Sequence, residues 1–323
     1  MRFGKATAVQ SAGVLSVSDD SSAGPTPSVP ARLLCHIARW AQRRSVFHNA
    51  AGLERTIHEA NYRAWRYREL GQQLTSYFDV TEIEGKDVLD FGCGTGEMCT
   101  LLSAYKPRSL IGVDKSTDAI DRATILANAS KVLDSCHHRF ACNGRQEPLP
   151  LESESVDLVC CFDVIEHIPD MHAMTREWWR VMRHGARLWV WWSPWRGPYG
   201  HHFESLMPMP WIHLLFPERT LFAACAKLYE DPDFVPRMWD RDPITGAKKP
   251  NKWRNTHTFY PVLNQLTRRK FEQIVQEAGL TIARHETYGF RGSRSRRATR
   301  VLLPIPWLGE CFVSFYVYEL TKR

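Results

Sequence analysis

Two short segments near residue 90 constrain the fold of this chain more than any other part of it. Residues 88–96 read Val-Leu-Asp-Phe-Gly-Cys-Gly-Thr-Gly, and Asp114 ends a second apolar segment eighteen residues later. The first strand therefore runs into an Asp-x-Gly-x-Gly-x-Gly turn, whereas dinucleotide-binding enzymes carry Gly-x-Gly-x-x-Gly at this place. The pattern predicts bare backbone close to a ligand that is not a diphosphate, with an acidic residue suited to a ribose diol.

Strand and helix patterns alternate after this point. Residues 156–164 form a nearly continuous apolar run, which is typical of a strand buried on both faces. Five strands with short helical crossovers predict a parallel, doubly wound sheet with right-handed connections. The expected strands are residues 87–91, 109–114, 138–142, 156–164 and 187–192, with two more at 281–287 and 311–320. Upstream, a helical period predicts one buried stripe made of Ile57, Ala60, Ala64, Tyr67, Leu74 and Phe78.

Composition places few limits on the partner. The net charge of +7, from 42 basic and 35 acidic residues, suits an anionic substrate or weak nucleic-acid affinity and requires neither. The nine cysteines lack the paired spacing of a zinc site, so we expect reduced thiols in a cytoplasmic protein, and no metal. No signal-peptide core is apparent at the N-terminus. Prolines and Glu310 interrupt the apolar stretch 301–320, which favours two strands joined by a turn over a membrane span.

Four segments together resemble the class I S-adenosylmethionine-dependent methyltransferases, in particular small-molecule enzymes of the ubiquinone-biosynthesis type. Residues 88–96 resemble motif I of that family, and residues 112–116 resemble its acidic ribose motif. Residues 147–159 and 162–168 are similar to the segments that enter and leave its fourth strand. The resemblance implies an α/β fold with a doubly wound, seven-stranded Rossmann-like sheet whose last strand is antiparallel. It also implies S-adenosyl-L-methionine as cofactor and S-adenosyl-L-homocysteine as product.

The same motifs predict the cofactor contacts. Asp114 can accept charge-assisted hydrogen bonds from both ribose hydroxyls, and Asp90 is expected to orient the turn and the cofactor's amino group. Glu166 is a candidate partner for the cofactor's ammonium group. Asn143 stands near the adenine position, where the family usually has Asp. The full predicted set is Asp90, Gly92, Cys93, Gly94, Gly96, Asp114, Lys115, Asn143, Gly144, Phe162, Asp163 and Glu166.

Histidines dominate the predicted acceptor side. His167 follows the fourth strand at the carboxyl edge, where ligands bind in open α/β sheets, and imidazole is the usual base near neutral pH. His201 and His202 follow the fifth strand at the same edge and complete the predicted catalytic set. The predicted substrate-binding residues are Trp195, Arg196, Tyr199, His257 and Tyr260.

The expected organisation has five parts: a disordered tail, an N-terminal helical cap, a cofactor-binding core, a substrate-lid insertion and a C-terminal completion of the sheet. Their ranges are 1–30, 31–84, 85–193, 194–264 and 265–323. An aromatic, proline-rich insertion favours methyl transfer to a small metabolite in a biosynthetic pathway, with nucleic acid an unlikely partner. Two alternatives remain open: an RNA methyltransferase that uses the arginines between 291 and 300, and a catalytically inactive cofactor-binding or scaffold protein.

Overall fold

The computed structural model describes residues 29–144, 148–242, 244–260, 262–289, 301–305 and 308–323. Nearly all of the predicted disordered tail and the whole arginine run between 291 and 300 therefore lie outside the described residues. So does Glu147, the first residue of the segment expected to lead into the fourth strand.

The described chain builds one seven-stranded sheet in the order β3-β2-β1-β4-β5-β7-β6. The pairs β1–β2, β2–β3, β1–β4 and β4–β5 are parallel, whereas β7 runs antiparallel to both β5 and β6. The expected doubly wound sheet with an antiparallel last strand is confirmed. Its strands are β1 Asp87–Phe91, β2 Ser109–Asp114, β3 His137–Cys142, β4 Val156–Phe162, β5 Met182–Trp192, β6 Leu280–Gly289 and β7 Val313–Lys322.

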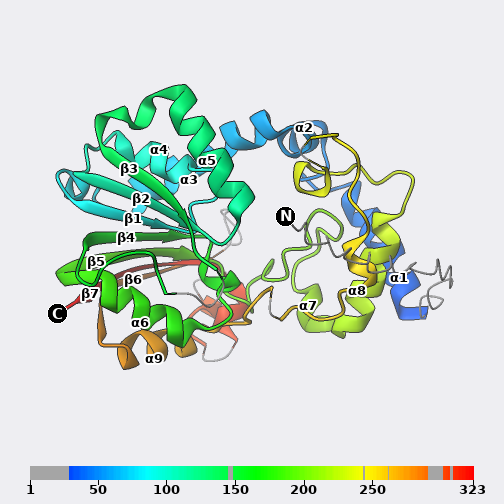
Figure 1. Ribbon diagram of the computed structural model, residues 1–323. Coiled ribbons are helices and arrows are strands. Elements are labelled where there is room, and N and C mark those ends of the chain that lie inside the picture. The colour runs from blue at the N-terminus through cyan, green and yellow to red at the C-terminus, as the bar shows by residue number, and fades with distance from the viewer. Residues whose placement is uncertain (1–28, 145–147, 243, 261, 290–300, 306–307) are drawn as a thin grey trace, which may run out of the picture.

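Helices cover both faces of the sheet (Figure 1). The helices of the chain are α1 Val29–Gln42, α2 Ala50–Ile57, α3 Glu59–Tyr77, α4 Glu97–Ser103, α5 Thr117–Ser130, α6 Met171–Val181, α7 Ile212–Leu215, α8 Glu218–Tyr229 and α9 Arg268–Glu277. Short 3-10 helices are η1 Val80–Ile83, η2 Val132–Ser135, η3 Ile165–His167, η4 Met238–Asp240, η5 Lys252–Arg254 and η6 Gly309–Phe312. Ser116 caps α5 as expected, because its Oγ accepts a hydrogen bond from Ala119 N at 3.2 Å.

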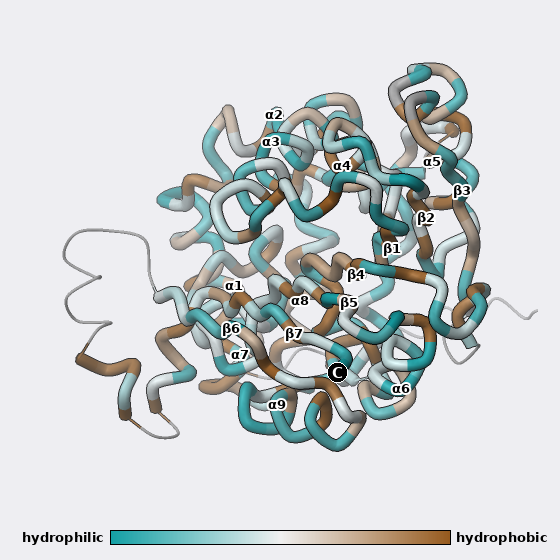
Figure 2. Tube along the Cα trace, turned by 90° about the vertical axis from the view of Figure 1, so that its left-hand side faces the viewer, coloured by the Kyte–Doolittle hydropathy of each residue, from teal (hydrophilic) through white to brown (hydrophobic). Residues whose placement is uncertain are grey.

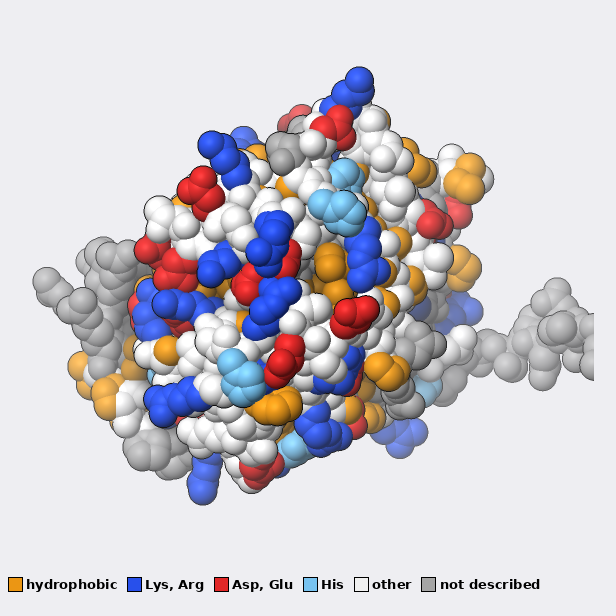
Figure 3. All heavy atoms as spheres, turned by 60° about the vertical axis from the view of Figure 1, so that its left-hand side comes forward, with side chains coloured by type: hydrophobic (Ala, Val, Ile, Leu, Met, Phe, Trp, Pro, Cys, Tyr) orange, Lys and Arg blue, Asp and Glu red, His pale blue; other side chains and the backbone are white. Residues whose placement is uncertain are grey.

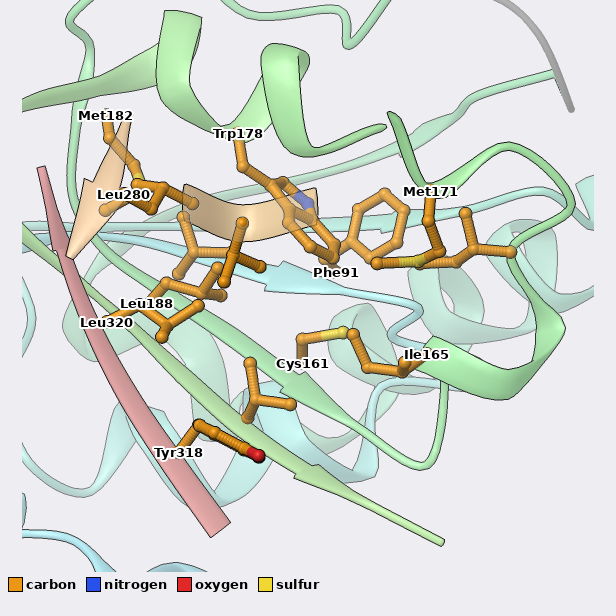
Figure 4. Close-up of a cluster of buried hydrophobic side chains, with 14 of the residues drawn as sticks. Phe91, Cys161, Ile165, Met171, Trp178, Met182, Leu188, Leu280, Tyr318 and Leu320 are labelled. Carbon is orange, nitrogen blue, oxygen red and sulfur yellow. The ribbon is translucent and has the colours of Figure 1, made fainter. Parts of the chain in front are cut away.

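Two hydrophobic cores lie on opposite faces of the sheet. One is formed with α6 and α9, and the other with α3, α4 and α5. Adjacent Cys160 and Cys161 contribute to different cores, as alternation along a strand requires. In the first core, the rings of Phe91 and Trp178 meet edge to face at 5.4 Å between centroids (Figure 4). In Figure 2, β1 and β4 carry hydrophobic segments while much of α9 is hydrophilic, as the buried strands and the amphipathic helix require.

A third hydrophobic cluster lies outside the sheet and joins distant parts of the chain. Leu34, Cys35 and Ala38 of α1 pack with α8 and with residues of the 203–263 region. Figure 1 shows α1, α7 and α8 together at the end of the molecule away from the sheet. The Arg39 guanidinium also bonds the Asp231 carboxylate, with Nε at 2.7 Å from Oδ2. The start of the described chain therefore packs with the segment predicted to be the substrate-lid insertion.

Two local predictions were wrong. Ala60, Ala64 and Tyr67 of the expected stripe are exposed, because α3 turns a different face inward, as described below. The stretch 301–320 contributes a single strand, β7, preceded by η6, instead of two strands with a turn. No helix among the described residues is long and apolar enough to cross a membrane.

Candidate functional site

The glycine turn after β1 adopts a backbone that few other residues could follow. Gly92, Gly94 and Gly96 have φ angles of +79°, +52° and +88°. Gly92 N and Cys93 N both donate to Val113 O, at 2.7 and 3.0 Å, which ties the turn to the end of β2. A Cβ on Gly92 would lie 2.3 Å from Val164 Cγ2. The left-handed backbone and this close approach explain why the sequence has glycine here.

Asp114 closes the turn from the neighbouring strand. Its Oδ2 accepts a hydrogen bond from Gly94 N at 3.0 Å, and its Oδ1 accepts one from Ser116 N at 2.9 Å. These two bonds fix the plane of the carboxylate. Each oxygen keeps a second lone pair, so the group can still accept bonds from a vicinal diol.

A cavity of about 210 Å³ opens beside this carboxylate, at the carboxyl ends of β1, β2 and β4. The structure brings six predicted cofactor residues into its wall: Gly92, Asp114, Lys115, Asn143, Gly144 and Asp163. The other lining residues are Phe91, Val113, Val164, His167, Ile168, Pro169 and Met174. The cavity therefore joins the ribose end of the predicted site to the predicted base His167.

The residues at this cavity suit the S-adenosylmethionine that the sequence predicts as cofactor. A Cβ on Gly94 would meet nothing within 4 Å, so there is open space beside the turn at this glycine. Asp114 presents a fixed acceptor pair, and apolar side chains such as Val113 and Ile168 supply flat contacts for a base. Bare backbone, a diol acceptor and an apolar slot fit an adenosyl ligand.

Comparison with known proteins identifies this architecture. Residues 89–190 match the family model described as a methyltransferase domain. Residues 89–190 therefore form a methyltransferase domain within the seven-stranded sheet. The matched range begins in β1 and ends in β5, so the methyltransferase domain includes the glycine turn, Asp114 and His167.

Curated relatives are similar to part of the chain. The ubiquinone biosynthesis O-methyltransferase of Coxiella burnetii is 27% identical over 152 residues, which is 47% of this chain and 58% of that protein. A probable S-adenosylmethionine-dependent methyltransferase of Mycolicibacterium smegmatis is 35% identical over 138 residues, which is 41% of this chain and 47% of that protein. The chain thus spans about half the length of the curated relatives it matches.

Solved structures similar to the chain include two methyltransferases. A geranyl diphosphate methyltransferase in complex with S-adenosylmethionine has a TM-score of 0.48 and 14% identity, covering 82% of this chain and 90% of that chain. A methyltransferase from Methanosarcina mazei has a TM-score of 0.45 and 17% identity, covering 77% of this chain and 95% of that chain.

Several predicted cofactor residues of the methyltransferase domain lie behind the cavity wall. Asp90 is 3% exposed, and its Oδ2 accepts a hydrogen bond from Cys99 Sγ at 3.1 Å. Burial raises the pKa of Asp90 to about 7. Cys93 and Phe162 are buried in the core on the α3–α4–α5 face, and Gly96 is the N-cap of α4. These residues shape the turn from behind, and direct cofactor contact by Asp90 stays a prediction.

Glu166, His167 and His202 lie close together, and His167 is the member of this group that lines the cavity. Their potential ligand atoms all lie within 4.8 Å of one another. Glu166 is 6% exposed, and burial, together with the nearby Asp163 carboxylate, raises its pKa to about 8. His167 Nδ1 lies 3.0 Å from Val262 O, and burial lowers the pKa of His167. The folded domain therefore unites two of the predicted catalytic histidines with a predicted cofactor residue.

His201, the third predicted catalytic residue, is held by backbone contacts of the loop after β5. Its side chain is fully buried, its Nδ1 accepts a hydrogen bond from Phe203 N at 2.9 Å, and its Nε2 lies 3.1 Å from Met209 O. Both ring nitrogens are thus engaged by backbone, and the ring holds the loop after β5. A catalytic role for His201 stays a prediction.

The predicted substrate-binding residues do not line the cavity. Trp195 packs in the third cluster, where its ring lies 4.8 Å from that of Phe259. Arg196 is half-buried, and Tyr199 is exposed on the loop after β5. His257 and Tyr260 are exposed on the segment after η5. Their assignment to a substrate rests on sequence alone.

Sequence reasoning expected the helix before the first strand to cover the sheet edge or the cofactor mouth, but it missed the arginines of α3 near the site. Arg66 Nη1 lies 2.6 Å from Asp163 Oδ2, and Arg63 Nε donates to Glu97 Oε1 at 2.8 Å. The inward face of α3 thus carries arginines near the site and Leu70 and Leu74 over the core. A search for an apolar stripe cannot find a helix face that is half charged. The pairing of Arg63, Arg66 and Leu70 at helical spacing was the available signal.

Proposed function

We propose that this protein transfers the methyl group of S-adenosylmethionine to a small metabolite in a biosynthetic pathway. One observation carries the proposal: a single cavity joins Asp114, the diol acceptor, to His167, the nearest imidazole. The relative from Coxiella burnetii is named a ubiquinone biosynthesis O-methyltransferase, which supports an oxygen atom on a small molecule as the acceptor.

The residues of the chain have separate tasks in this reaction. The glycine turn admits the amino-acid part of the cofactor, and Asp114 holds the ribose. When bound, S-adenosylmethionine supplies a methyl group that is already activated for direct displacement. The protein therefore has to align the acceptor and exclude water. His167 stays neutral near pH 7 because its pKa is lowered, so it can accept a proton from an acidic acceptor.

The segment after η5 fixes the acceptor end of the site. Asn264 Nδ2 donates to Ile165 O at 2.6 Å and to Ile168 O at 2.9 Å, and Asn264 N donates to Glu166 O at 2.9 Å. These three bonds hold the η3 turn, and with it His167, against the end of the predicted insertion. We infer that the insertion positions the base and covers the reacting atoms.

Among the residues that the structure describes, an RNA substrate has no comparable support. On the face shown in Figure 3, Lys and Arg side chains are interspersed with Asp and Glu side chains. At the amino ends of the strands, Arg108 and Arg183 both pair with Asp87 and Asp157. Phosphate tracking depends on unneutralised basic groups, and these arginines are already paired with carboxylates.

A labelled-methyl assay tests the proposal. Purified full-length protein is incubated with isotopically labelled S-adenosylmethionine and either a small-molecule extract or total RNA from the source cells. We expect label in the small-molecule fraction and none in RNA. Label in RNA would show that the substrate is RNA and not a small metabolite. The absence of transfer to either pool would support a catalytically inactive cofactor-binding or scaffold protein.

A further inference from the structure

The cluster of Glu166, His167 and His202 has a property that the proposed reaction does not require. Glu166 is 6% exposed, and its Oε2 is buried with no hydrogen-bond partner among the described residues. Its Oε1 lies 3.8 Å from His202 Nε2, too far for a hydrogen bond. A buried carboxylate oxygen without a partner is costly, and a cation beside it would remove that cost.

The two histidines have ring nitrogens that could bind such a cation. A proton on His167 Nδ1 is donated to Val262 O at 3.0 Å, which leaves the Nε2 lone pair available. Metal-binding histidines have this arrangement, since a backbone carbonyl that accepts from one ring nitrogen fixes the tautomer and aims the other. His202 Nε2 points toward Glu166, and the rings of His167 and His202 meet at 5.1 Å between centroids.

Backbone conformation and hydrogen bonds fix the positions of His167 and His202 near Glu166. His202 has a φ of +55°, a conformation that a non-glycine residue adopts at a cost and that clusters at functional sites. Its neighbour His201 is anchored by both ring nitrogens, so the loop turns only His202 toward Glu166. On the other side, Asn264 bonds the backbone of the η3 turn.

We propose that Glu166, His167 and His202 form a binding site for a divalent transition metal, with Zn²⁺ as the best match. Two imidazole nitrogens and one carboxylate are the ligand set of open zinc sites, with bonds of about 2.0–2.2 Å. Ligand atoms within 4.8 Å of one another need side-chain adjustments of about 1 Å to share one ion at such bond lengths. The sequence alone could not predict this ligand set, because η3 supplies two of its residues and the loop after β5 supplies the third.

The metal site changes how the acceptor loses its proton, and this step rests on the proposed function. With a metal on its Nε2, His167 acts as a ligand, and the metal takes the place of His167 as the group that activates the acceptor. His167 lies in the wall of the cavity, and three protein ligands leave a coordination position open. A substrate hydroxyl bound there would lose its proton to solvent more readily, because a bound cation lowers the pKa of an oxygen ligand. The oxygen lone pair then forms the new O–C bond while the S–C bond breaks and its electron pair stays on sulfur. The products are a methyl ether, S-adenosylhomocysteine and one proton.

The test measures metal binding by untagged, full-length protein after treatment with a chelator and dialysis. Zn²⁺ is titrated calorimetrically into the wild type, Glu166→Gln, His202→Ala and the control His184→Ala, which removes an exposed histidine at the amino end of the sheet. We expect one tight Zn²⁺ per wild-type and control chain, and affinities at least about tenfold weaker in the two site variants. Equal affinity in all four proteins, or no binding by the wild type, would overturn the site.

Two further measurements keep the outcome clear. Co²⁺ in the wild type should give the visible absorption of a four-coordinate site, which does not depend on the folding of any variant. The absence of that absorption would count against the site. S-adenosylhomocysteine is titrated into the same proteins, and we expect His202→Ala to retain it, because His202 does not line the cavity. Loss of Zn²⁺ binding with retained S-adenosylhomocysteine binding supports the metal site, whereas absent S-adenosylhomocysteine binding in the wild type contradicts the proposed function.

Discussion

Asp90 illustrates how folding changes the role that a motif assigns to a residue. The motif predicts a ligand contact, yet the carboxyl group is 3% exposed and its pKa is raised to about 7 by burial. The folded state therefore holds a proton that the unfolded chain releases near its ordinary pKa. The contribution of Asp90 to stability is full below about pH 4 and is lost as the pH rises through about 7.

Asp90→Asn removes this titration, so the variant should gain stability relative to the wild type as the pH rises. We expect the melting temperature of Asp90→Asn minus that of the wild type to increase from about pH 5 to about pH 8. Thermal unfolding of both proteins across this range measures it. A difference that stays constant with pH would show that Asp90 ionises normally in the folded protein.

Gly92→Ala should be among the most damaging changes in the turn. The new Cβ would lie 2.3 Å from Val164 Cγ2, in addition to the cost of a positive φ. Gly85→Ala is the matched control, because Gly85 has a φ of +70° and open space around the Cβ position. We expect Gly92→Ala to lose about 1–3 kcal/mol more stability than the control in urea unfolding. Equal losses would mean that Val164 moves aside freely.

At the scale of elements, the sequence predicts those features that depend on residues close together in the chain. The glycine turn, the strand ends and the Ser116 cap fell where their residue types require, and six of the predicted cofactor residues reach the cavity as a result. The partners of individual side chains depend on segments far away in sequence. Val262 and Asn264 orient the η3 turn, and Met209 engages His201, so no local signal could assign these roles.

The α3 helix provides an element-scale test. Arg66→Ala removes the partner of Asp163 and should loosen the first half of α3, whereas Arg68→Ala changes an exposed residue of the same helix. Leaving a charged group without its hydrogen bond costs roughly 1–3 kcal/mol. Hydrogen exchange should therefore quicken in residues 59–69 of Arg66→Ala and stay unchanged in Arg68→Ala. Identical exchange in both variants would remove Arg66 from the account.

At the scale of the whole molecule, the chain contains a sheet with its two cores and a separate cluster that joins α1 to the 203–263 region. Patterning within one segment could not predict this union, because α1 and α8 are far apart in sequence and each is amphipathic alone. The proposed division into cap, core and lid accordingly needs α1 to be considered together with the lid.

Leu34→Ala tests this union. Leu34 is 1% exposed in the third cluster, whereas its neighbour Leu33 is 57% exposed. We expect Leu34→Ala to reduce the free energy of unfolding of the unit that contains α8 by about 2–5 kcal/mol, and Leu33→Ala to have little effect. Denaturant unfolding followed by Trp fluorescence measures both. Equal effects of the two substitutions would argue that α1 does not pack as described.

The central claim is that the glycine turn and Asp114 bind the adenosyl part of S-adenosylmethionine. Its most direct measurement is calorimetric titration of S-adenosylhomocysteine into the wild type, Asp114→Ala and the control Asp118→Ala, which changes an exposed carboxylate of α5. We expect the wild type and the control to bind one ligand per chain, and Asp114→Ala to bind it about 1–3 kcal/mol more weakly. Unchanged affinity in Asp114→Ala, or tighter binding of a nicotinamide dinucleotide than of S-adenosylhomocysteine, would contradict the claim.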